Sequence, residues 1–324
     1  MTAPRFDVLG IGNAIVDVIV QIDDDFLAAN QVTRGAMTLI DDERAEQLYA
    51  AMPAGLEMSG GCAGNTVAGV ASLGGKAAYI GKVRNDQLGS VFTHDIRAGG
   101  IEFTTSPAMM GPPTARCLIL VTPDGERSMS TFLGACTTLS PDDIDAEIVS
   151  ASAVTYLEGY LFDPPAAQQA FYEAARIAHA AGRKVALTLS DSFCVDRHRA
   201  AFRDLVEGHV DILFANEHEI ASLYETSFDE AAAIVKTKCD LAALTRGAKG
   251  SLIVSPAENV VVPAAPVTKV VDTTGAGDLY AAGFLYGWAT GRSPAESGRI
   301  GSIAAGTIIA QVGARPQRRL SDLI

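Results

Sequence analysis

The sequence predicts an α/β fold in which helices pack on a mostly parallel central sheet and a small β lid covers one face. Short β-rich runs alternate with helical segments along nearly the whole chain, which is the pattern of such a sheet. One interval, residues 114–132, breaks this rhythm and is typical of a hairpin. With 48% hydrophobic and 19% charged residues, the 324-residue chain fits a globular protein with a large core. We expect residues 1–324 to form a single domain.

The expected elements of the main sheet alternate along the chain. Helical segments lie between the strands, such as residues 165–181, where apolar residues recur three and four apart, and residues 196–207. Right-handed crossovers through such helices build a parallel sheet. A further β-branched run, residues 267–271, predicts a strand just before a glycine-rich turn. The strands expected to be buried are residues 6–11, 77–82, 154–157, 184–189, 212–214, 241–245 and 251–255.

The lid is expected to use segments within about residues 13–40 and 104–133. Residues 116–121 and 127–132 are strand-like, and the turn between them contains Pro123 and Gly125, which suit it. Residues 15–22 also alternate in polarity as a strand does.

Composition excludes several classes of function. The net charge of −13 makes binding of nucleic acid or anionic membranes unfavourable. No run predicts a signal peptide or a membrane span. The five cysteines are scattered without a C-x-x-C pair, so we expect reduced thiols and a cytoplasmic protein. We expect a small-molecule substrate, and either a monomer or a homodimer.

The segment DTTGAGD, residues 272–278, is the most informative part of the chain. Gly275 and Gly277 permit close approach of a ligand, and the run that follows them is helical. The unpaired amides of a first helical turn favour an anion, so Gly275, Ala276 and Gly277 predict an anion hole. Asp278 then lies where it is able to take a proton from an attacking hydroxyl. An ordinary acidic residue in a first helical turn is the alternative.

Four other segments carry polar residues at expected strand ends or helix starts. Each also has a purely structural explanation: helix packing for the segment with Gly60, Gly61 and Asn65, a turn for Asn13 and Asp17, a helix cap for Asn216 and Glu219, and a hairpin for Thr245, Gly247 and Gly250. Magnesium prefers oxygen ligands, so Glu219 is a candidate to hold Mg2+ through water. No GxxxxGK[ST] is present, and the early GIG lacks the third glycine of a dinucleotide fingerprint.

Taken together, SGGCAGNT, NEHE, TRGAKG and DTTGAGD resemble, in order and context, the ribokinase-like or PfkB family of carbohydrate and nucleoside kinases. This resemblance covers almost the whole chain. It implies a three-layer α/β/α sandwich with a β lid, ATP as phosphoryl donor and Mg2+ as its partner.

The resemblance also implies roles for matching residues. Asp278 matches the catalytic base, and Gly275, Ala276 and Gly277 match the anion hole. Asn216 and Glu219 match the metal and phosphate motif; Thr245, Gly247 and Gly250 match positions beside ATP; Gly60, Gly61 and Asn65 match those that hold the acceptor. Asp272 matches a residue that orders a monovalent cation, K+, in some relatives.

Within the family the chain resembles the adenosine kinases. The stretch from Gly12 to Asp17 resembles their segment that binds ribose hydroxyls, Arg127 resembles a lid arginine that clamps the transferred phosphate, and Phe193 resembles a residue beside the base. Leu161 departs from a position that is often aromatic there. The resemblance implies phosphorylation of the 5′-hydroxyl of a nucleoside, with adenosine as the favoured acceptor. A family member acting on ribose, fructose or a related sugar is the alternative; a nucleotide-dependent sensor and a nicotinamide dehydrogenase agree less well with the motifs.

Overall fold

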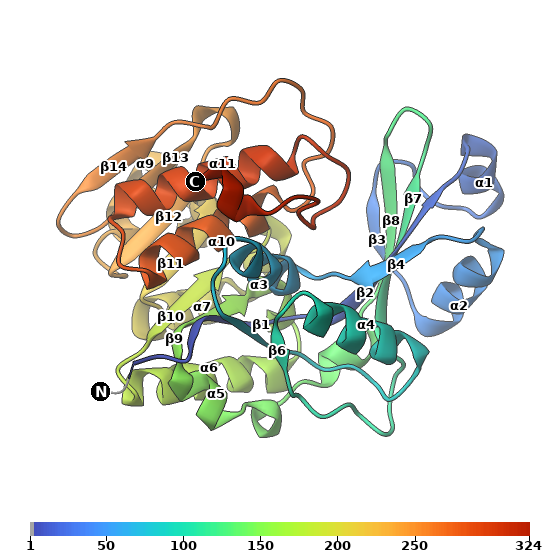
Figure 1. The fold of residues 1–324 in the computed structure, drawn as a ribbon, viewed down its shortest axis with the longest axis horizontal. Helices are drawn as coiled ribbons and strands as arrows, with labels where there is room; N and C mark the ends of the chain where they lie inside the picture. The colour runs from blue at the N-terminus through green and yellow to red at the C-terminus, as the bar shows by residue number, and fades with distance from the viewer. Residues whose placement is uncertain (1–2) are drawn as a thin grey trace.

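A nine-stranded sheet forms the body of the molecule in the computed structural model, which describes residues 3–324 (Figure 1). Seven neighbouring strands of this sheet run parallel, namely β6, β5, β1, β9, β10, β11 and β12. Strands β13 and β14 join the β12 edge in antiparallel pairing. In spatial order the strands are β14 (Asn259–Val262), β13 (Ser251–Val254), β12 (Leu241–Thr245), β11 (Ile212–Asn216), β10 (Lys184–Thr188), β9 (Ser152–Glu158), β1 (Phe6–Ile11), β5 (Ala77–Ile80) and β6 (Glu102–Phe103).

Helices cover both faces of this sheet, because its strands bury side chains on both. In β10, Ala186 belongs to the core on one face, whereas Val185 and Leu187 belong to the core on the other. The first face carries α3 (Cys62–Ser72), α4 (Gln87–Ala98), α10 (Ala276–Ala289) and α11 (Pro294–Ile308). The second carries α5 (Ala146–Ala151), α6 (Pro165–Ala180), α7 (Ser192–His209), α8 (Glu217–Tyr224) and α9 (Phe228–Val235). The predicted three-layer α/β/α architecture is confirmed.

A second, five-stranded sheet stands beside the body at the right of Figure 1. Its strands, in spatial order, are β3 (Met37–Leu39), β8 (Arg127–Phe132), β7 (Ala115–Val121), β2 (Ile15–Gln21) and β4 (Leu56–Ser59). The predicted hairpin is present as β7 and β8, and in it Val121 lies opposite Arg127. The short strand β4, which pairs with β2, was not predicted. Helices α1 (Asp24–Ala29) and α2 (Asp42–Ala51) flank this sheet.

One strand prediction is wrong. Residues 267–271 form no strand, and Val270 and Val271 are 55% and 44% exposed. The backbone amides of Val271 and Asp272 donate instead to the carbonyl of Ile309, just after α11. The β-branched run therefore satisfies its backbone against a helix end, and the turn before α10 is reached by an irregular connection.

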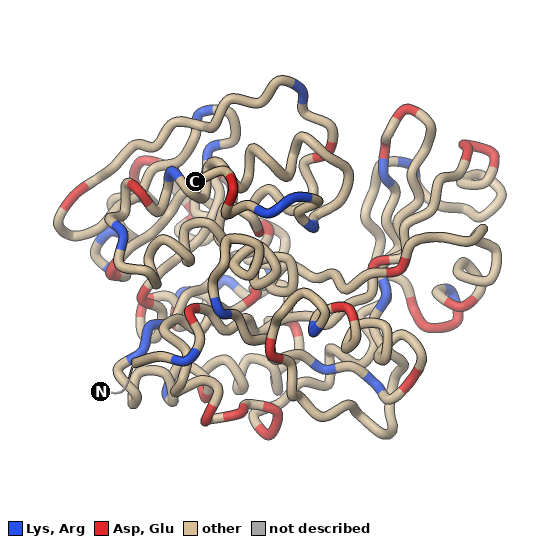
Figure 2. The backbone as a smooth tube through the Cα atoms, viewed as in Figure 1, with Lys and Arg blue, Asp and Glu red and all other residues tan. Residues whose placement is uncertain are grey.

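Charged positions are scattered over both parts of the molecule, with Asp and Glu on the body and on the second sheet and Lys and Arg among them (Figure 2). Within residues 3–324, no helix has the length and apolar character that crossing a membrane requires.

Candidate active site

The glycine-rich turn before α10 leaves backbone donors free, as predicted, but not all of those predicted. Gly275 caps the helix with a left-handed φ of 77°. The Ala276 amide donates to the Thr273 carbonyl at 3.2 Å, so it is already used, which corrects the expectation for that amide. Within the described chain the amides of Gly277 and Asp278 have no protein acceptor. A methyl group added to Gly277 would meet no atom within 4 Å, so there is room for an anion above this turn.

Asp278 lies in the first turn of α10 and is held by α3. Its Oδ2 accepts a hydrogen bond from Asn65 Nδ2 at 2.9 Å. Burial raises the pKa of Asp278 to about 6, against the lowering effects of Asn65, the Cys62 thiol and the Arg315 guanidinium. A carboxyl with such a pKa is able to act as a general base near neutral pH. Asn65 Oδ1 is buried without a hydrogen-bond partner, so it is available to accept from a ligand hydroxyl.

The residues expected to hold an acceptor come together beneath this turn. A side chain on Gly60 would meet the Asp17 carboxylate at 2.4 Å, and one on Gly61 would meet the Asn13 carbonyl at 2.2 Å. Gly61 also has a φ of 81°, which strongly favours glycine. The pKa of Asp17 rises to about 6 through burial, with Arg315 and Arg127 opposing the rise. The two segments are therefore packed as one surface, with Asp17 lying over Gly60.

Glu158, at the end of β9, was not singled out from the sequence. Asn13 donates to it from Nδ2 at 2.7 Å and from its backbone amide at 3.3 Å, and the Ala63 amide donates at 2.8 Å. Burial raises the pKa of Glu158 to about 7, although these hydrogen bonds lower it. The Asn13 amide group is thus occupied by Glu158. The one available signal was an acidic residue ending a buried apolar strand.

Asn216 and Glu219 form a capping box at the start of α8. Asn216 Nδ2 donates to Glu219 Oε1 at 2.6 Å, and the Asn216 amide donates to Glu219 Oε2 at 2.9 Å. The helix-cap explanation is therefore geometrically correct. Even so, both residues line a narrow pocket of about 100 Å³ that Thr245, Gly277 and Asp278 also line. Three sequence-distant segments meet there.

This oxygen-lined pocket fits a magnesium ion that is brought in with phosphates. Burial raises the pKa of Glu219 to about 7, so the carboxylate lacks a full counter-charge that a cation would supply. Each Glu219 oxygen accepts only one of the cap hydrogen bonds, which leaves acceptor capacity for water. Within residues 3–324, no three His, Cys, Asp or Glu side chains form a metal cage. Magnesium commonly keeps several waters and needs few protein ligands.

Arg127 reaches from the second sheet to the turn before α10. Its Nη2 lies 3.0 Å from Asp272 Oδ2, with both side chains 9% exposed, and its Nη1 donates to Thr274 Oγ1 at 3.4 Å. The Nη2 contact is close enough for an ion pair but lacks hydrogen-bond alignment, so this nitrogen still has a proton to donate.

Asp272 is surrounded by donors. Thr274 donates to Oδ1 from its amide and its hydroxyl, and Gly313 donates to Oδ2 at 2.8 Å. Although burial opposes it, this bonding and the Arg127 charge lower the pKa of Asp272. The arginine supplies the counter-charge that K+ would supply, so Asp272 does not fit the expected role in binding a monovalent cation.

The two glycines expected beside ATP both lie in the turn between β12 and β13, but their surroundings differ. A side chain on Gly250 would meet the Val262 carbonyl at 2.0 Å, so packing alone requires glycine there. Gly247 has a φ of 57° and open space around it, and Thr245 lines the pocket. The hairpin explanation is correct for Gly250, whereas Gly247 is free to lie beside a ligand.

The residues near the expected position of the nucleobase divide into two groups, one buried and one exposed. Phe162 and Leu161 are buried in the core beneath α6 and α7. Phe193 is 74% exposed at the start of α7, three residues after Ser190, which lines the pocket. Phe193 is therefore not a core residue, and its ring is open to a ligand.

Arg315, in the segment after α11, was also not singled out from the sequence. Its guanidinium donates to the carbonyls of Ser59 and Gly64, and its charge faces Asp17 and Asp278. No local pattern marks it, because its partners lie some 250 residues earlier.

Comparisons with known proteins agree with this geometry. Residues 37–319 match the family described as pfkB family carbohydrate kinase. The crystal structure of a probable sugar kinase protein from Rhizobium etli is 55% identical, covers 99% of this chain and 98% of that one, and superposes with a TM-score of 0.91. An adenosine kinase from Sinorhizobium meliloti is 57% identical, with 98% of each chain covered and a TM-score of 0.90. An ATP-dependent ribose-1-phosphate kinase from Halopiger xanaduensis is 30% identical over 72% of this chain and 74% of its own length.

Proposed function

Because the chain belongs to the pfkB family of carbohydrate kinases, we propose that it transfers the γ-phosphoryl group of ATP to the 5′-hydroxyl of adenosine, giving AMP and ADP. The observation that carries the kinase chemistry is the pairing of Asp278 with Asn65 at the start of α10. It brings a carboxylate with a pKa of about 6 beside two free backbone amides.

The reaction needs a base and a stabilised phosphoryl group at the same point. In the proposed step the acceptor oxygen forms a bond to the γ-phosphorus while the bond from that phosphorus to the bridging oxygen breaks. The electron pair leaves with ADP, and Asp278 takes the hydroxyl proton. The amides of Gly277 and Asp278 and the guanidinium of Arg127 stabilise the charge on the phosphoryl oxygens as it develops.

Asn216 and Glu219 would hold the Mg2+ that accompanies ATP, with Glu219 acting through water. When bound, the ion supplies positive charge to the phosphate oxygens. Thr245 lines the same pocket, and Gly247, which has open space around it, would lie beside the nucleotide.

The acceptor would lie on the surface made by Asp17, Gly60, Gly61 and Asn65. The Asp17 carboxylate and the unpartnered Asn65 Oδ1 are acceptors suited to the hydroxyls of a ribose. Adenosine is supported by the 57% identity to the Sinorhizobium enzyme and by the exposed ring of Phe193, which is able to stack on a base. A free or phosphorylated sugar is the second candidate, favoured by the names of the Rhizobium and Halopiger relatives.

Purified protein assayed with ATP and Mg2+ against adenosine, other nucleosides, ribose, ribose 1-phosphate and fructose tests the proposal. ADP formation and the phosphorylated product are followed together, so that ATP hydrolysis is not mistaken for transfer. We expect adenosine to have the highest kcat/KM and AMP to equal ADP in amount. Turnover of the sugars with none of adenosine would overturn the choice of acceptor but keep the phosphoryl transfer.

A further inference from the structure

Three consecutive residues after α11 contact three different parts of the site. The Gly313 amide donates to Asp272 Oδ2 at 2.8 Å, and Ala314 packs so closely on Gly275 that a side chain there would meet its Cβ at 2.7 Å. Arg315 then turns to the other glycine-rich segment, residues 59–64, which runs from the end of β4 into the first turn of α3 and is called the acceptor loop below. This segment therefore ties the phosphate-side turn to the acceptor-side loop.

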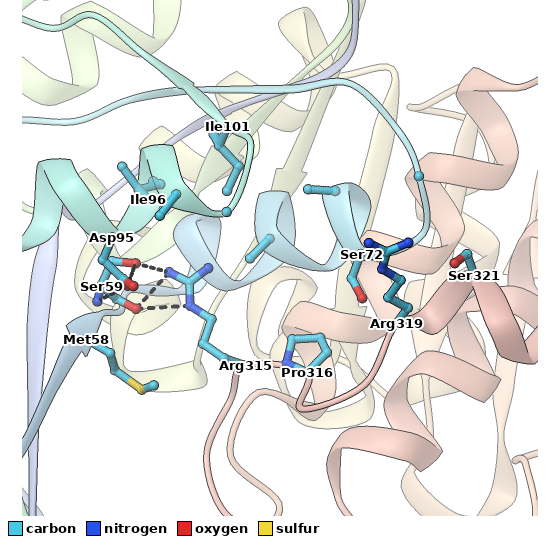
Figure 3. Close-up of a pocket in the computed structure, with 15 residues that line it drawn as sticks. Met58, Ser59, Ser72, Asp95, Ile96, Ile101, Arg315, Pro316, Arg319 and Ser321 are labelled. Carbon is cyan, nitrogen blue, oxygen red and sulfur yellow. Dashed lines mark hydrogen bonds between the residues drawn. The ribbon is translucent and has the colours of Figure 1, made fainter.

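The Arg315 guanidinium holds both ends of the acceptor loop, and Figure 3 shows its hydrogen bonds to Ser59 at one of them. Nε and Nη2 donate to the Ser59 carbonyl at 3.0 and 2.8 Å, and Nη2 donates to Ser59 Oγ at 3.0 Å. Nη1 donates to the Gly64 carbonyl at 2.7 Å. On the opposite side, Asp95 Oδ2 accepts from the Ser59 amide at 2.7 Å and from its hydroxyl at 2.6 Å. Such charge-assisted hydrogen bonds are stronger than neutral ones, and the planar fork also fixes direction.

The residues between these anchors are those that would meet the acceptor. The Asp17 carboxylate packs directly on Gly60, and the Asn13 carbonyl packs on Gly61. Asn65, which follows the second anchor directly, donates to Asp278. A shift of the loop would therefore move the hydroxyl-binding surface and the partner of the base together.

The charge of Arg315 also acts on the site. Asp17, Asp278, Asp95 and Tyr79 face the guanidinium, and its charge opposes the burial that raises the pKa of Asp17 and Asp278. The other groups facing these two carboxyls are Cys62, Asn65, Cys117, Tyr156, Glu158 and Arg127. Arginine stays protonated throughout the working pH range of a protein.

We propose that Arg315 is a positioning residue of the phosphoryl-transfer site, which holds residues 59–64 beneath the acceptor and keeps Asn65 directed at Asp278. This inference rests on the proposed function, because it assigns those residues to the acceptor. Arg319, four residues later, provides an internal comparison. It lines the same cavity of about 600 Å³ as Arg315 but is exposed, and no contact of its side chain with the loop is present within residues 3–324.

The test compares Arg315→Ala, Arg315→Lys and the control Arg319→Ala in full kinetics. For Arg315→Ala we expect the acceptor kcat/KM to fall by roughly 10²-fold, the KM for ATP to change by less than about threefold, and the acid limb of the kcat/KM profile to move to higher pH. Arg315→Lys keeps the positive charge but loses the planar guanidinium that binds two acceptors at once. The acid limb of its kcat/KM profile should therefore stay near that of the wild type, whereas its KM for the acceptor should be higher than the wild-type value. Arg319→Ala should match the wild type.

Chemical rescue gives a readout that a general loss of stability would not produce. Because Arg315 lines an open cavity, millimolar guanidinium should enter the space left in Arg315→Ala and restore a measurable part of its activity. The same salt should leave the wild type and Arg319→Ala unchanged.

Hydrogen exchange of the free proteins separates this inference from the proposed function. Arg315→Ala should exchange faster than the wild type in the peptide covering residues 59–66, with the peptide at 251–262 as an unchanged reference. Faster exchange with no turnover of any acceptor by the wild type would reject the proposed function and keep the positioning role. An active wild type together with unchanged kinetics and exchange in Arg315→Ala would overturn the positioning role.

Discussion

At Asp278, burial and hydrogen bonding act in opposite directions on one carboxyl group. Burial raises its pKa to about 6, while Asn65, Cys62 and Arg315 keep it from rising further. A carboxyl with this pKa is mostly ionised at pH 7 yet basic enough to take a proton from a hydroxyl, as the proposed reaction requires. A fully solvated aspartate would be a weaker base, because its pKa would lie near 3.8.

Asp278→Asn should reduce kcat by roughly 10³-fold, about 4 kcal/mol of barrier, because the amide is unable to accept the proton. ATP binding, measured by calorimetry, and the circular dichroism spectrum should be close to those of the wild type. Near-normal turnover in this variant would remove Asp278 from the role of base.

Arg127→Ala should reduce kcat more than it raises the KM for the acceptor, because the guanidinium is expected to contact the phosphoryl group most strongly at the transition state. We expect a loss of roughly 10²-fold in kcat, measured at saturating ATP. The variant also removes the ion pair to Asp272, so Asp272→Asn, which removes the charge of that partner and leaves the Arg127 guanidinium in place, serves as the control. A rise in acceptor KM with unchanged kcat would contradict the assignment.

At the scale of the element, the first turn of α10 uses its two glycines for different purposes. Gly275 has a φ of 77° and lies against Ala314, so both backbone and packing demand glycine. Gly277 is inside the helix with open space above it. The first glycine therefore shapes the turn, and the second keeps room for a ligand.

This difference predicts opposite outcomes for matched substitutions. Gly275→Ala should lower the free energy of unfolding by about 2–4 kcal/mol, through left-handed strain and overlap with Ala314. Gly277→Ala should leave it unchanged or raise it by up to about 1 kcal/mol, since alanine favours a helix. Yet Gly277→Ala should raise the KM for ATP by roughly tenfold, because the methyl group enters the space proposed for phosphate. Equal stability losses, or normal ATP kinetics in Gly277→Ala, would refute this division.

At the scale of the whole molecule, two sheets and four segments distant in sequence converge on one buried acidic region. Asp17, Glu158, Glu219 and Asp278 all have a raised pKa, of about 6 for the two aspartates and about 7 for the two glutamates, and burial is the leading cause in each. Collecting these carboxyls weakens the folded protein when they are ionised, as is expected of a site made for a cation and a phosphate.

The pH dependence of stability follows from these shifts. The folded protein binds more protons than the unfolded chain between the ordinary pKa values, 3.8 and 4.5, and the raised values, so stability should fall as the pH rises through this window. Each of these four carboxyls lowers the free energy of unfolding by on the order of 1–3 kcal/mol across this window. Carboxyls with a lowered pKa, such as Asp211 and Asp272, are ionised in both states above about pH 5 and do not oppose the trend there.

Urea unfolding at about pH 5.5 and about pH 8 measures this effect, and the midpoint should be lower at pH 8. Asp278→Asn should reduce the difference between the two midpoints, since it removes one of the titrating carboxyls. A higher midpoint at pH 8 in the wild type would show that other groups dominate.

The sequence by itself determined the alternation of strands and helices, the β7–β8 hairpin and the glycine-rich start of α10. These depend on local signals: hydrophobic period, turn residues and backbone freedom. The strand predicted for residues 267–271 was wrong because it also depended on a local signal. A β-branched composition indicates strand propensity, but it does not indicate whether a neighbouring strand is present to pair with.

Only the tertiary structure decided how the polar residues pair. Asp272 takes Arg127 as its counter-charge, Asn13 is occupied by Glu158, and Arg315 holds Ser59 and Gly64 from the far end of the chain. The partners in these pairs lie from 145 to 256 residues apart. A hydrogen bond depends on distance and direction in space, and no local pattern encodes which distant group will satisfy a buried charge.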